Sequence, residues 1–385
     1  MPALPKSTPV AVVGAGTMGA GIAQVAARAA HDVLLYDQDA AALARARTQI
    51  DADLDRLADK GRIASHDRGA IGARIRICET LDGLSGAGLV IEAIVEALEP
   101  KRALFAELEK RVESETILAS NTSSLSITAI AAGLKHPERL AGMHFFNPAP
   151  VMRLVEIVRG IATSPATVDT LRATVEAWGK VPALAASTPG FIVNRVARGF
   201  YAEGLRALTE QAADAATIDA VMRECGGFRM GPFELIDLIG VDVNLAVTRS
   251  VFEAYYQDSR FRPSVVQQAL VDAGRLGRKS GRGFYRHGDG VAPPKPRTAA
   301  RAEPPGQVLV HGSLGPADAI LSLLAQSPLK KGAGTRGAPS DSSHRRKPVS
   351  RVPETLDSGF RRNDEVSGDL NALEADGVLV TLTDG

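Results

Sequence analysis

Hydrophobic positions in the first half of the chain fall into short apolar runs that are separated by stretches with helical spacing. Residues 9–37, PVAVVGAGTMGAGIAQVAARAAHDVLLYD, contain an apolar run, a glycine-containing turn, an alanine-rich stretch and a second apolar run ending on Asp37. This pattern predicts strand, tight turn, helix and strand. Further buried strands are predicted at 88–96, at 116–124, and in RLAGMHFF and MRLVEIVRG. Strands that alternate with helical crossovers predict a parallel sheet with helices on both faces.

The pattern changes at Thr188-Pro189-Gly190. From there to about residue 272 the apolar positions have helical spacing, and strand-like runs are almost absent. Thr188 as N-cap and Pro189 at the first helical position predict where the first of these helices begins. We therefore predict an α/β domain at residues 1–187 and an all-helical domain at residues 188–287.

The composition changes again beyond the predicted helical domain. Residues 288–307 are rich in proline, alanine and charge, which predicts a linker without a core of its own. In the tail, 308–385, the segment 308–326 could form one strand and one helix, and 378–383 one more strand. The intervening stretch 327–365 is basic and low in large apolar residues, which predicts disorder.

The overall composition suits two globular domains or slightly more. The chain has 385 residues, of which 45% are hydrophobic and 23% charged, and a net charge of +1 that gives no global sign of nucleic-acid binding. The two cysteines, Cys78 and Cys225, lie far apart and lack metal-ligand spacing, so we expect neither a disulfide nor a metal site. A chain without disulfides fits a location in a reducing cytoplasm. The N-terminus has no signal-peptide core, and no run approaches the ~18 apolar residues of a membrane span. A soluble protein without membrane contact is expected.

Gly14, Gly16 and Gly19 form a G-x-G-x-x-G pattern between the first predicted strand and helix. In a Rossmann-type, doubly wound fold, Gly14 would make the turn, Gly16 would admit a pyrophosphate, and Gly19 would bring helix close to strand. Asp37 ends the next strand, at the offset expected of a residue that binds the ribose 2′-hydroxyl. Its charge would repel a 2′-phosphate, and the two following residues offer no arginine, so NAD is predicted rather than NADP. A structural turn in another doubly wound fold is the alternative.

Two titratable residues lie within apolar runs: His144 in AGMHFFNPAP and Glu156 in LVEIV. A carboxylate in a buried strand costs several kcal/mol unless it is paired or hydrogen-bonded. Its candidate partners nearby in the sequence are Arg153, Arg159 and His144. If the two strands are adjacent, Glu156 can accept from one ring nitrogen of His144 and leave the other free to take a proton. The pattern alone leaves open whether His144 is a general base or a packed core histidine.

Six motifs occur in order between about residues 8 and 287: VVGAGTMGAGIAQ, SNTSSL, HFFNPAPVMRLVEIV, TPGFIVNR, MGPFELIDLIG and GRKSGRGFY. Together they resemble those of the 3-hydroxyacyl-CoA dehydrogenase family, including the 3-hydroxybutyryl-CoA dehydrogenases and the phenylacetate-catabolism branch. The resemblance implies NAD-dependent oxidation of an (S)-3-hydroxyacyl-CoA to the 3-oxoacyl-CoA, in fatty-acid or phenylacetate catabolism.

The resemblance also implies roles for individual residues. His144 would be the general base, Glu156 would orient it and balance its charge, and Ser123 and Asn194 would hold the substrate's C3 oxygen or the catalytic ring. Besides the glycine loop, the positions that match cofactor contacts of the family are Asp37, Glu96, Lys101, Asn147 and Lys279. Those that match contacts to the CoA ester are Ser123 and Lys60.

Several of these positions have a structural alternative. Lys60 could be a solvated helix-end lysine, Lys101 an exposed residue in the first turn of a helix, and Asn194 a polar residue on an exposed helical face. The residues that could replace Lys279 are Arg275, Arg278 and Arg282, and those that compete with Ser123 are Ser120, Thr122 and Ser124. Packing is the expected role of Met143, Phe145 and Phe146.

Two rival functions remain open: a non-catalytic protein on the same scaffold, and a dehydrogenase of another small hydroxy acid. The joint presence of Ser123, His144, Glu156 and Asn194 argues against the first, and the histidine where the second class usually has a lysine base argues against that one. The apolar helix surface predicted for residues 190–272 suggests a homodimer. Residues 291–385 lie outside the resemblance to the short members of the family, and no second copy of the helical domain, as in longer members, is recognisable there.

Overall fold

The computed structural model describes residues 1–292, 294–298, 307–311, 372–375 and 378–383. The chain divides into two compact units, Met1–Arg297 and Thr298–Gly385. In the second unit, β9 (Gln307–His311), β10 (Ala372–Ala375) and β11 (Val378–Thr383) form an antiparallel sheet in the order β10-β11-β9. Strands are thus present where the patterns at 308 and 378–383 predicted them. The helix expected before residue 326 and the disorder expected at 327–365 lie outside the described residues.

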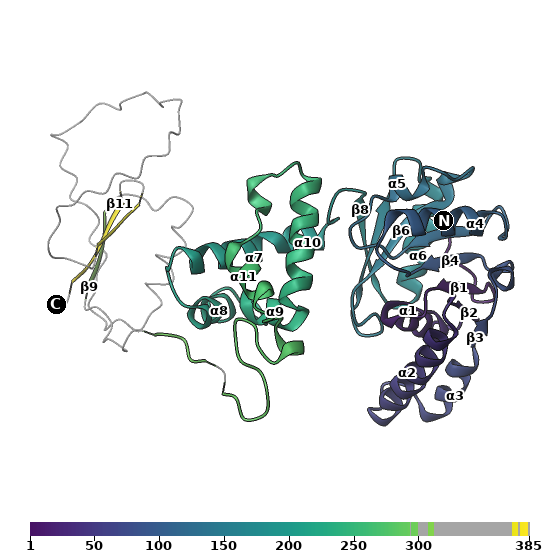
Figure 1. The fold of residues 1–385 in the computed structure, drawn as a ribbon, viewed down its shortest axis with the longest axis horizontal. Coiled ribbons are helices and arrows are strands. Elements are labelled where there is room, and N and C mark those ends of the chain that lie inside the picture. Colours follow the sequence, from purple (N-terminus) through teal and green to yellow (C-terminus); the bar gives the residue numbers. More distant parts are fainter. Residues whose placement is uncertain (293, 299–306, 312–371, 376–377, 384–385) are drawn as a thin grey trace. The chain divides into compact units, whose positions relative to one another are not determined.

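One eight-stranded sheet forms the framework of the first unit (Figure 1). Its order is β3-β2-β1-β4-β5-β6-β7-β8, and the pairs from β3 to β6 are parallel. The order reverses between β1 and β4, which leaves a crevice at their carboxyl ends, the usual place for a dinucleotide. The strands are β1 (Val10–Val13), β2 (Val33–Tyr36), β3 (Ile75–Cys78), β4 (Leu89–Glu92), β5 (Ile117–Ser120), β6 (Leu140–Phe145), β7 (Leu154–Arg159) and β8 (Val181–Ala186).

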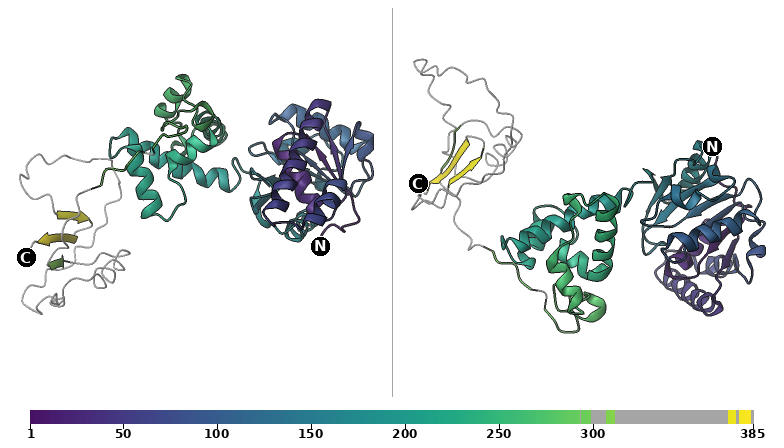
Figure 2. Two further views of the ribbon diagram at one scale, coloured as in Figure 1. Left: turned by 90° about the horizontal axis from the view of Figure 1, so that it is seen from below. Right: turned by 45° about the horizontal axis from the view of Figure 1, so that its top comes forward.

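Helices cover both faces of this sheet (Figures 1 and 2). Because alternate residues of a strand point to opposite faces, Val10 and Val12 join one hydrophobic core, and Ala11 and Val13 join the other. The first core is completed by α1 (Thr17–Arg28), α2 (Ala40–Asp59), α3 (Ser65–Ala73) and α6 (Pro165–Ala177), and the second by α4 (Leu98–Glu109) and α5 (Ile127–Ala131). The predicted α/β fold is confirmed.

The prediction of a parallel sheet is wrong at one edge. β6 and β7 pair antiparallel, and β8 is parallel to β7. Only the short segment 146–153 connects β6 to β7, and so short a connection cannot make the crossover that a parallel pair needs. Two strands, β3 and β8, were not singled out by the hydrophobic pattern.

The segment after the sheet is helical, as predicted. A shared core of Tyr201, Leu205, Phe233, Ile236 and Val241 holds it together. Its helices are α7 (Val193–Thr209), α8 (Ala215–Glu224), α9 (Pro232–Ile239), α10 (Val241–Ala254) and α11 (Val265–Asp272). In the part of the chain that the structure describes, no helix is both long and apolar enough to cross a bilayer.

The predicted start of the first of these helices is wrong. The N-cap of α7 is Ile192, not Thr188, and its side chain makes no capping bond. Gly190 and Phe191 have φ values of +73° and +46°, a left-handed conformation that cannot continue a right-handed helix. The chain therefore turns between Thr188 and Phe191, and the helix begins only at Val193.

Candidate active site

The glycine loop joins β1 to α1 at the point where the strand order reverses. Gly14 has φ +107°, and a side-chain carbon there would lie 2.5 Å from the carbonyl oxygen of Ala93. A side-chain carbon on Gly19 would overlap the carbonyl oxygen of Gly14, so these two positions accept only glycine. Gly16 is the N-cap of α1, where nothing lies within 4 Å of a built side-chain carbon. The first N–H groups of α1 are therefore open to a phosphate, as the fingerprint requires.

Asp37 lies directly beside this loop. Its Oδ2 accepts from the backbone N–H of Ala15 at 2.7 Å, and its Oδ1 accepts from that of Asp39 at 2.9 Å. Arg45, on the following helix α2, is paired with Asp39 at 3.2 Å. The carboxylate is therefore held next to the loop, where it can accept from ribose hydroxyls and repel a phosphate. These residues fit the ribose and pyrophosphate of NAD.

The antiparallel pairing of β6 and β7 places His144 opposite Glu156. His144 Nδ1 lies 2.7 Å from Glu156 Oε2, and the two residues are 5% and 0% exposed. The ring also packs against Phe146 and Phe191, at centroid distances of 4.5 and 5.8 Å. No hydrogen bond to Nε2 is found within the described ranges, which leaves this nitrogen available to take a proton.

Glu156 has a second set of partners that the sequence did not suggest. Its Oε1 accepts from the backbone N–H groups of Ile192 and Val193, at 3.0 and 2.9 Å, where α7 begins. Burial alone would raise the pKa of Glu156, but His144 and these two N–H groups outweigh burial and hold the pKa below its usual value. A helix N-terminus carries partial positive charge and unpaired N–H groups, so it stabilises an ionised carboxylate. Glu156 thus links the histidine of the sheet to the first turn of α7.

The same helix carries Asn194, which is half-buried. Its side-chain nitrogen donates to the backbone carbonyl of Ser123 at 3.4 Å. The alternative of an exposed helical face is therefore wrong for Asn194. Ser123 and Asn194, which are 71 residues apart in the sequence, lie together.

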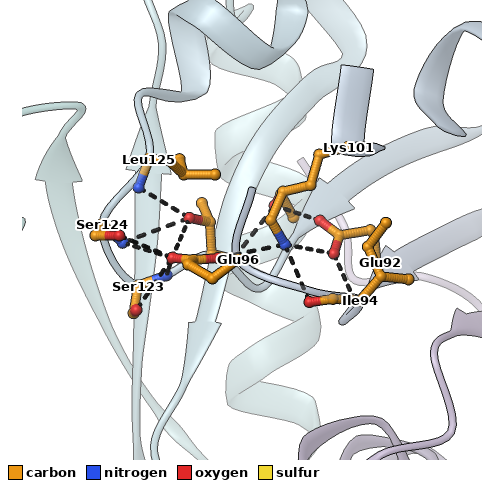
Figure 3. Close-up of polar contacts among 9 residues, drawn as sticks. Glu92, Ile94, Glu96, Lys101, Ser123, Ser124 and Leu125 are labelled. Atoms are coloured by element: carbon orange, nitrogen blue, oxygen red, sulfur yellow. Dashed lines mark hydrogen bonds and ion pairs between the residues drawn. The ribbon is translucent and has the colours of Figure 1, made fainter. Parts of the chain in front are cut away.

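Glu96 accepts several hydrogen bonds from the polar loop that contains Ser123 (Figure 3). Its Oε1 accepts from the backbone N–H groups of Ser123 and Ser124, at 2.8 and 3.0 Å. The hydroxyls of Thr122, Ser124 and Ser123 donate to the same oxygen, at 2.8, 3.0 and 3.1 Å. Burial would raise the pKa of Glu96, but Lys101 and the hydrogen bonds of this loop outweigh burial and lower it. Glu96 therefore sets the position of the Ser123 hydroxyl.

Lys101 belongs to a buried charge cluster next to this loop (Figure 3). Its side chain is 1% exposed, so the alternative of an exposed first-turn lysine is wrong. Its Nζ lies 2.6 Å from Oε1 of Glu92 and 3.4 Å from Oε2 of Glu96. Glu92, which is fully buried, also accepts from Ile94 N–H at 2.7 Å and Ser120 Oγ at 2.6 Å. The sequence interpretation missed Glu92, although a lone carboxylate that ends an apolar run is the same signal that singled out Glu156.

Asn147 lies on an exposed loop that follows β6 directly, and therefore close to His144 in sequence and along the strand. Lys180 stabilises the loop that contains Asn147, because its Nζ donates to the carbonyls of Ala149 and Met152, both at 2.6 Å. Burial lowers the pKa of Lys180 to about 8. The sequence offered no signal for this lysine, which lies 31 residues beyond Ala149.

The other two lysines are not joined to these groups. Lys60 is the exposed C-cap of α2, and none of the hydrogen bonds found between described side chains involves it. Lys279 lies 2.7 Å from Asp242 in the helical region. Across the described ranges, no group of His, Cys, Asp and Glu side chains is arranged to hold a metal ion.

Two family models match the chain in succession. Residues 9–188 match the NAD binding domain of 3-hydroxyacyl-CoA dehydrogenase, and residues 190–287 match its C-terminal domain. The prediction of an NAD-binding domain is therefore confirmed.

The chain is also similar to individual proteins. It is 55% identical to 3-hydroxyadipyl-CoA dehydrogenase of Escherichia coli (strain K12) over 276 residues, 72% of this chain but only 58% of that relative. It is 41% identical to a probable 3-hydroxybutyryl-CoA dehydrogenase of Deinococcus radiodurans, over 72% of this chain and 99% of the relative.

Solved structures of named dehydrogenases are also similar to this chain. A 3-hydroxybutyryl-CoA dehydrogenase from Escherichia coli K12 superposes with a TM-score of 0.73 at 49% identity, covering 81% of this chain and 66% of that one. An (S)-3-hydroxybutyryl-CoA dehydrogenase from Ralstonia eutropha superposes with a TM-score of 0.71 at 38% identity, covering 74% of this chain and 100% of that one.

Proposed function

Because the chain belongs to the 3-hydroxyacyl-CoA dehydrogenase family, we propose that it oxidises (S)-3-hydroxyacyl-CoA to 3-oxoacyl-CoA with NAD. The observation that carries this proposal is the His144–Glu156 pair. A buried imidazole is fixed at 2.7 Å from a buried carboxylate, in the sheet whose central crevice holds the glycine loop. Named relatives that act on 3-hydroxyadipyl-CoA and 3-hydroxybutyryl-CoA support the substrate class.

The proposed reaction divides the work among four side chains. His144 removes the proton of the C3 hydroxyl through Nε2, because Nδ1 faces Glu156. Glu156 holds the ring orientation and balances the positive charge that the ring acquires. Ser123 and Asn194 hold the C3 oxygen in place, which is a contribution of proximity. When bound, NAD accepts the hydride from C3.

The direct test is NADH formation from a series of (S)-3-hydroxyacyl-CoA substrates, from hydroxybutyryl to hydroxyadipyl. We expect turnover with members of this series and none with 3-hydroxyisobutyrate. Turnover of the small hydroxy acid alone would favour the rival dehydrogenase, and no turnover with any substrate by a folded protein would favour the non-catalytic scaffold.

Cofactor selectivity should depend on Asp37. Asp37→Ala removes a charged acceptor next to the ribose, a contact worth about 1.5–3 kcal/mol, so kcat/KM for NAD should fall by about 10- to 100-fold. Use of NADP should improve relative to NAD, because the repulsion of the 2′-phosphate is lost. The measurement is kcat/KM for both cofactors, with Asp32→Ala, which removes an exposed carboxylate at the opposite end of β2, as control. Wild-type use of NADP as efficient as that of NAD would contradict the assignment.

We propose that the protein is a homodimer formed through the helical region. Large apolar side chains are exposed there, among them Val196, Phe228, Leu238, Val243 and Val265. A segment of this size gains stability by burying such surface in a second copy. Light scattering at micromolar concentration should give twice the mass of one chain, and a monomer mass would refute the dimer.

The domain boundaries and the location of the protein are also proposals. We place the boundary between the NAD-binding and the helical domain at Thr188, just after β8 ends at Ala186. We propose a cytoplasmic location, which the free state of Cys78 and Cys225 supports.

A further inference from the structure

Lys180, in the turn between α6 and β8, is hydrogen-bonded to the β6–β7 loop, residues 146–153. Its Nζ donates to the carbonyl of Ala149 and to that of Met152, both at 2.6 Å. These two carbonyls lie three residues apart in the loop, which the chain crosses between two strands of the sheet. One ammonium group therefore holds the loop at two separate points.

The β6–β7 loop lies between two parts of the proposed active site. It begins directly after β6, the strand that carries His144. It also packs against α1, because a side-chain carbon built on Gly21 would lie 3.2 Å from the side chains of Ala149 and Pro150. Gly21 is about one helical turn from the N-terminus of α1, where the N–H groups are open to a phosphate. A bound dinucleotide must extend from there toward the hydroxyl that faces His144, so the loop borders this path.

A structural role alone does not explain a lysine at this position. No carboxylate in the described part of the chain forms an ion pair with Lys180, whereas the buried Lys101 has Glu92. Burial, with a further contribution from the charge of Arg28 on α1, lowers the pKa of Lys180 to about 8. At neutral pH, below this pKa, the charged lysine is therefore less stable in the fold than in the unfolded chain, where its pKa is higher. A cation kept at a cost in stability indicates a functional role.

We propose that Lys180 is a positioning residue that fixes the β6–β7 loop in the form that admits the nicotinamide half of NAD. This inference rests on the proposed function. The loop carries Asn147, whose exposed side chain follows the end of β6 by two residues. Without the ammonium, the loop holds its present form for a smaller fraction of the time, and the apparent affinity for the cofactor falls by that fraction. Lys180 acts through the loop and does not touch the reacting atoms.

The first test uses the protein without cofactor. The N–H groups of Val151 and Met152 both donate to the carbonyl of Pro148 at 3.0 Å, so hydrogen exchange of these two amides reports on the form of the loop. In Lys180→Met they should exchange about 10- to 100-fold faster, the factor expected when a hydrogen bond to a charged group is lost. Lys180→Arg keeps a charged donor and should retain most of the protection. Arg172→Met removes an exposed cation from α6 and is the matched control, which should exchange like the wild type.

The second test measures cofactor binding, turnover and stability separately. Lys180→Met should bind NADH about 10-fold more weakly, as expected if its loop holds the present form about a tenth of the time. KM for NAD should rise by a similar factor, while KM for the hydroxyacyl-CoA stays near the wild-type value. The free energy of unfolding should not fall, because the substitution also removes the cost of burying the ammonium. Arg172→Met should match the wild type in all of these quantities.

The outcomes separate this inference from the proposed function. Faster exchange and weaker NADH binding in Lys180→Met, in a protein that oxidises no hydroxyacyl-CoA, would support the role of Lys180 and overturn the proposed function. Wild-type affinity for NADH in Lys180→Met overturns the inference. A variant that is much less stable, or that fails to fold, shows a structural lysine and overturns it as well. In the wild type, NADH should slow exchange of the Val151 and Met152 amides, and equal exchange with and without NADH also contradicts the inference.

Discussion

Replacing His144 by glutamine should lower kcat for hydroxyacyl-CoA oxidation by at least ~10²-fold, the loss typical of a missing general base. Glutamine approximates the size of the ring but cannot take up the proton of the C3 hydroxyl. NAD binding should stay near the wild-type value, because the glycine loop and Asp37 follow β1 and β2, and none of the hydrogen bonds between described residues joins them to this ring. Steady-state kinetics and a titration with NADH measure the two quantities separately. His31→Gln is the matched control, since His31 is also buried but bonds to the carbonyl of Thr8, and it should leave kcat nearly unchanged.

For the His144–Glu156 pair we also expect that the losses of turnover caused by the two single substitutions do not add up in the double variant. Glu156→Gln keeps the shape, and its side-chain oxygen can still accept from the N–H groups at the start of α7, but it removes the negative charge opposite the ring. Turnover should therefore fall. Combined with His144→Gln, it should cost little more than His144→Gln alone, because both changes disable one unit. A double-mutant loss equal to the product of the single losses, or full turnover in Glu156→Gln, would return His144 to the role of a core histidine.

The second large effect concerns stability. Lys101→Met should lower the free energy of unfolding by about 3–5 kcal/mol, because it leaves Glu92 buried without its counter-charge. Glu92 is fully buried and lies 2.6 Å from the ammonium, so water cannot replace the lysine without opening the core. Urea unfolding followed by the fluorescence of Trp178 measures this effect locally. Trp178 is the only tryptophan of the chain and packs in a core of the α/β sheet.

Two further variants test whether the loss of the Lys101–Glu92 pair causes the lower free energy of unfolding. Adding Glu92→Gln to Lys101→Met removes the unpaired charge, so most of the lost stability should return. Lys110→Met removes an exposed lysine at the end of the same helix and should cost no more than about 0.5 kcal/mol. If Lys101→Met were no more destabilising than Lys110→Met, the pair would be exposed to water in solution.

The chain's local patterns were sufficient to predict most of the framework and the cofactor loop. Apolar runs of strand length, a glycine turn and an alanine-rich helix are neighbours in the sequence, so periodicity alone predicts how they fold. Gly14, Gly16, Gly19 and Asp37 were found in the same way, since their roles depend on spacing within one strand–helix–strand unit. The motif order then led to the family, which the matches over residues 9–188 and 190–287 show.

The tertiary structure decided which of the polar candidates meet. His144 and Glu156 face each other only because the short 146–153 connection makes β6 and β7 antiparallel and sets their register. Glu156 also accepts a hydrogen bond from the N–H of Ile192, which lies 36 residues further along the chain. Asn194 donates to the carbonyl of Ser123, although the two residues are 71 positions apart in the sequence. For Lys101 the sequence left two interpretations, a cofactor contact and an exposed residue in the first turn of a helix, and the structure shows a buried pair with Glu92. Sequence periodicity reports which face of an element is apolar, whereas the state of a buried charge depends on partners that distant parts of the chain bring to it.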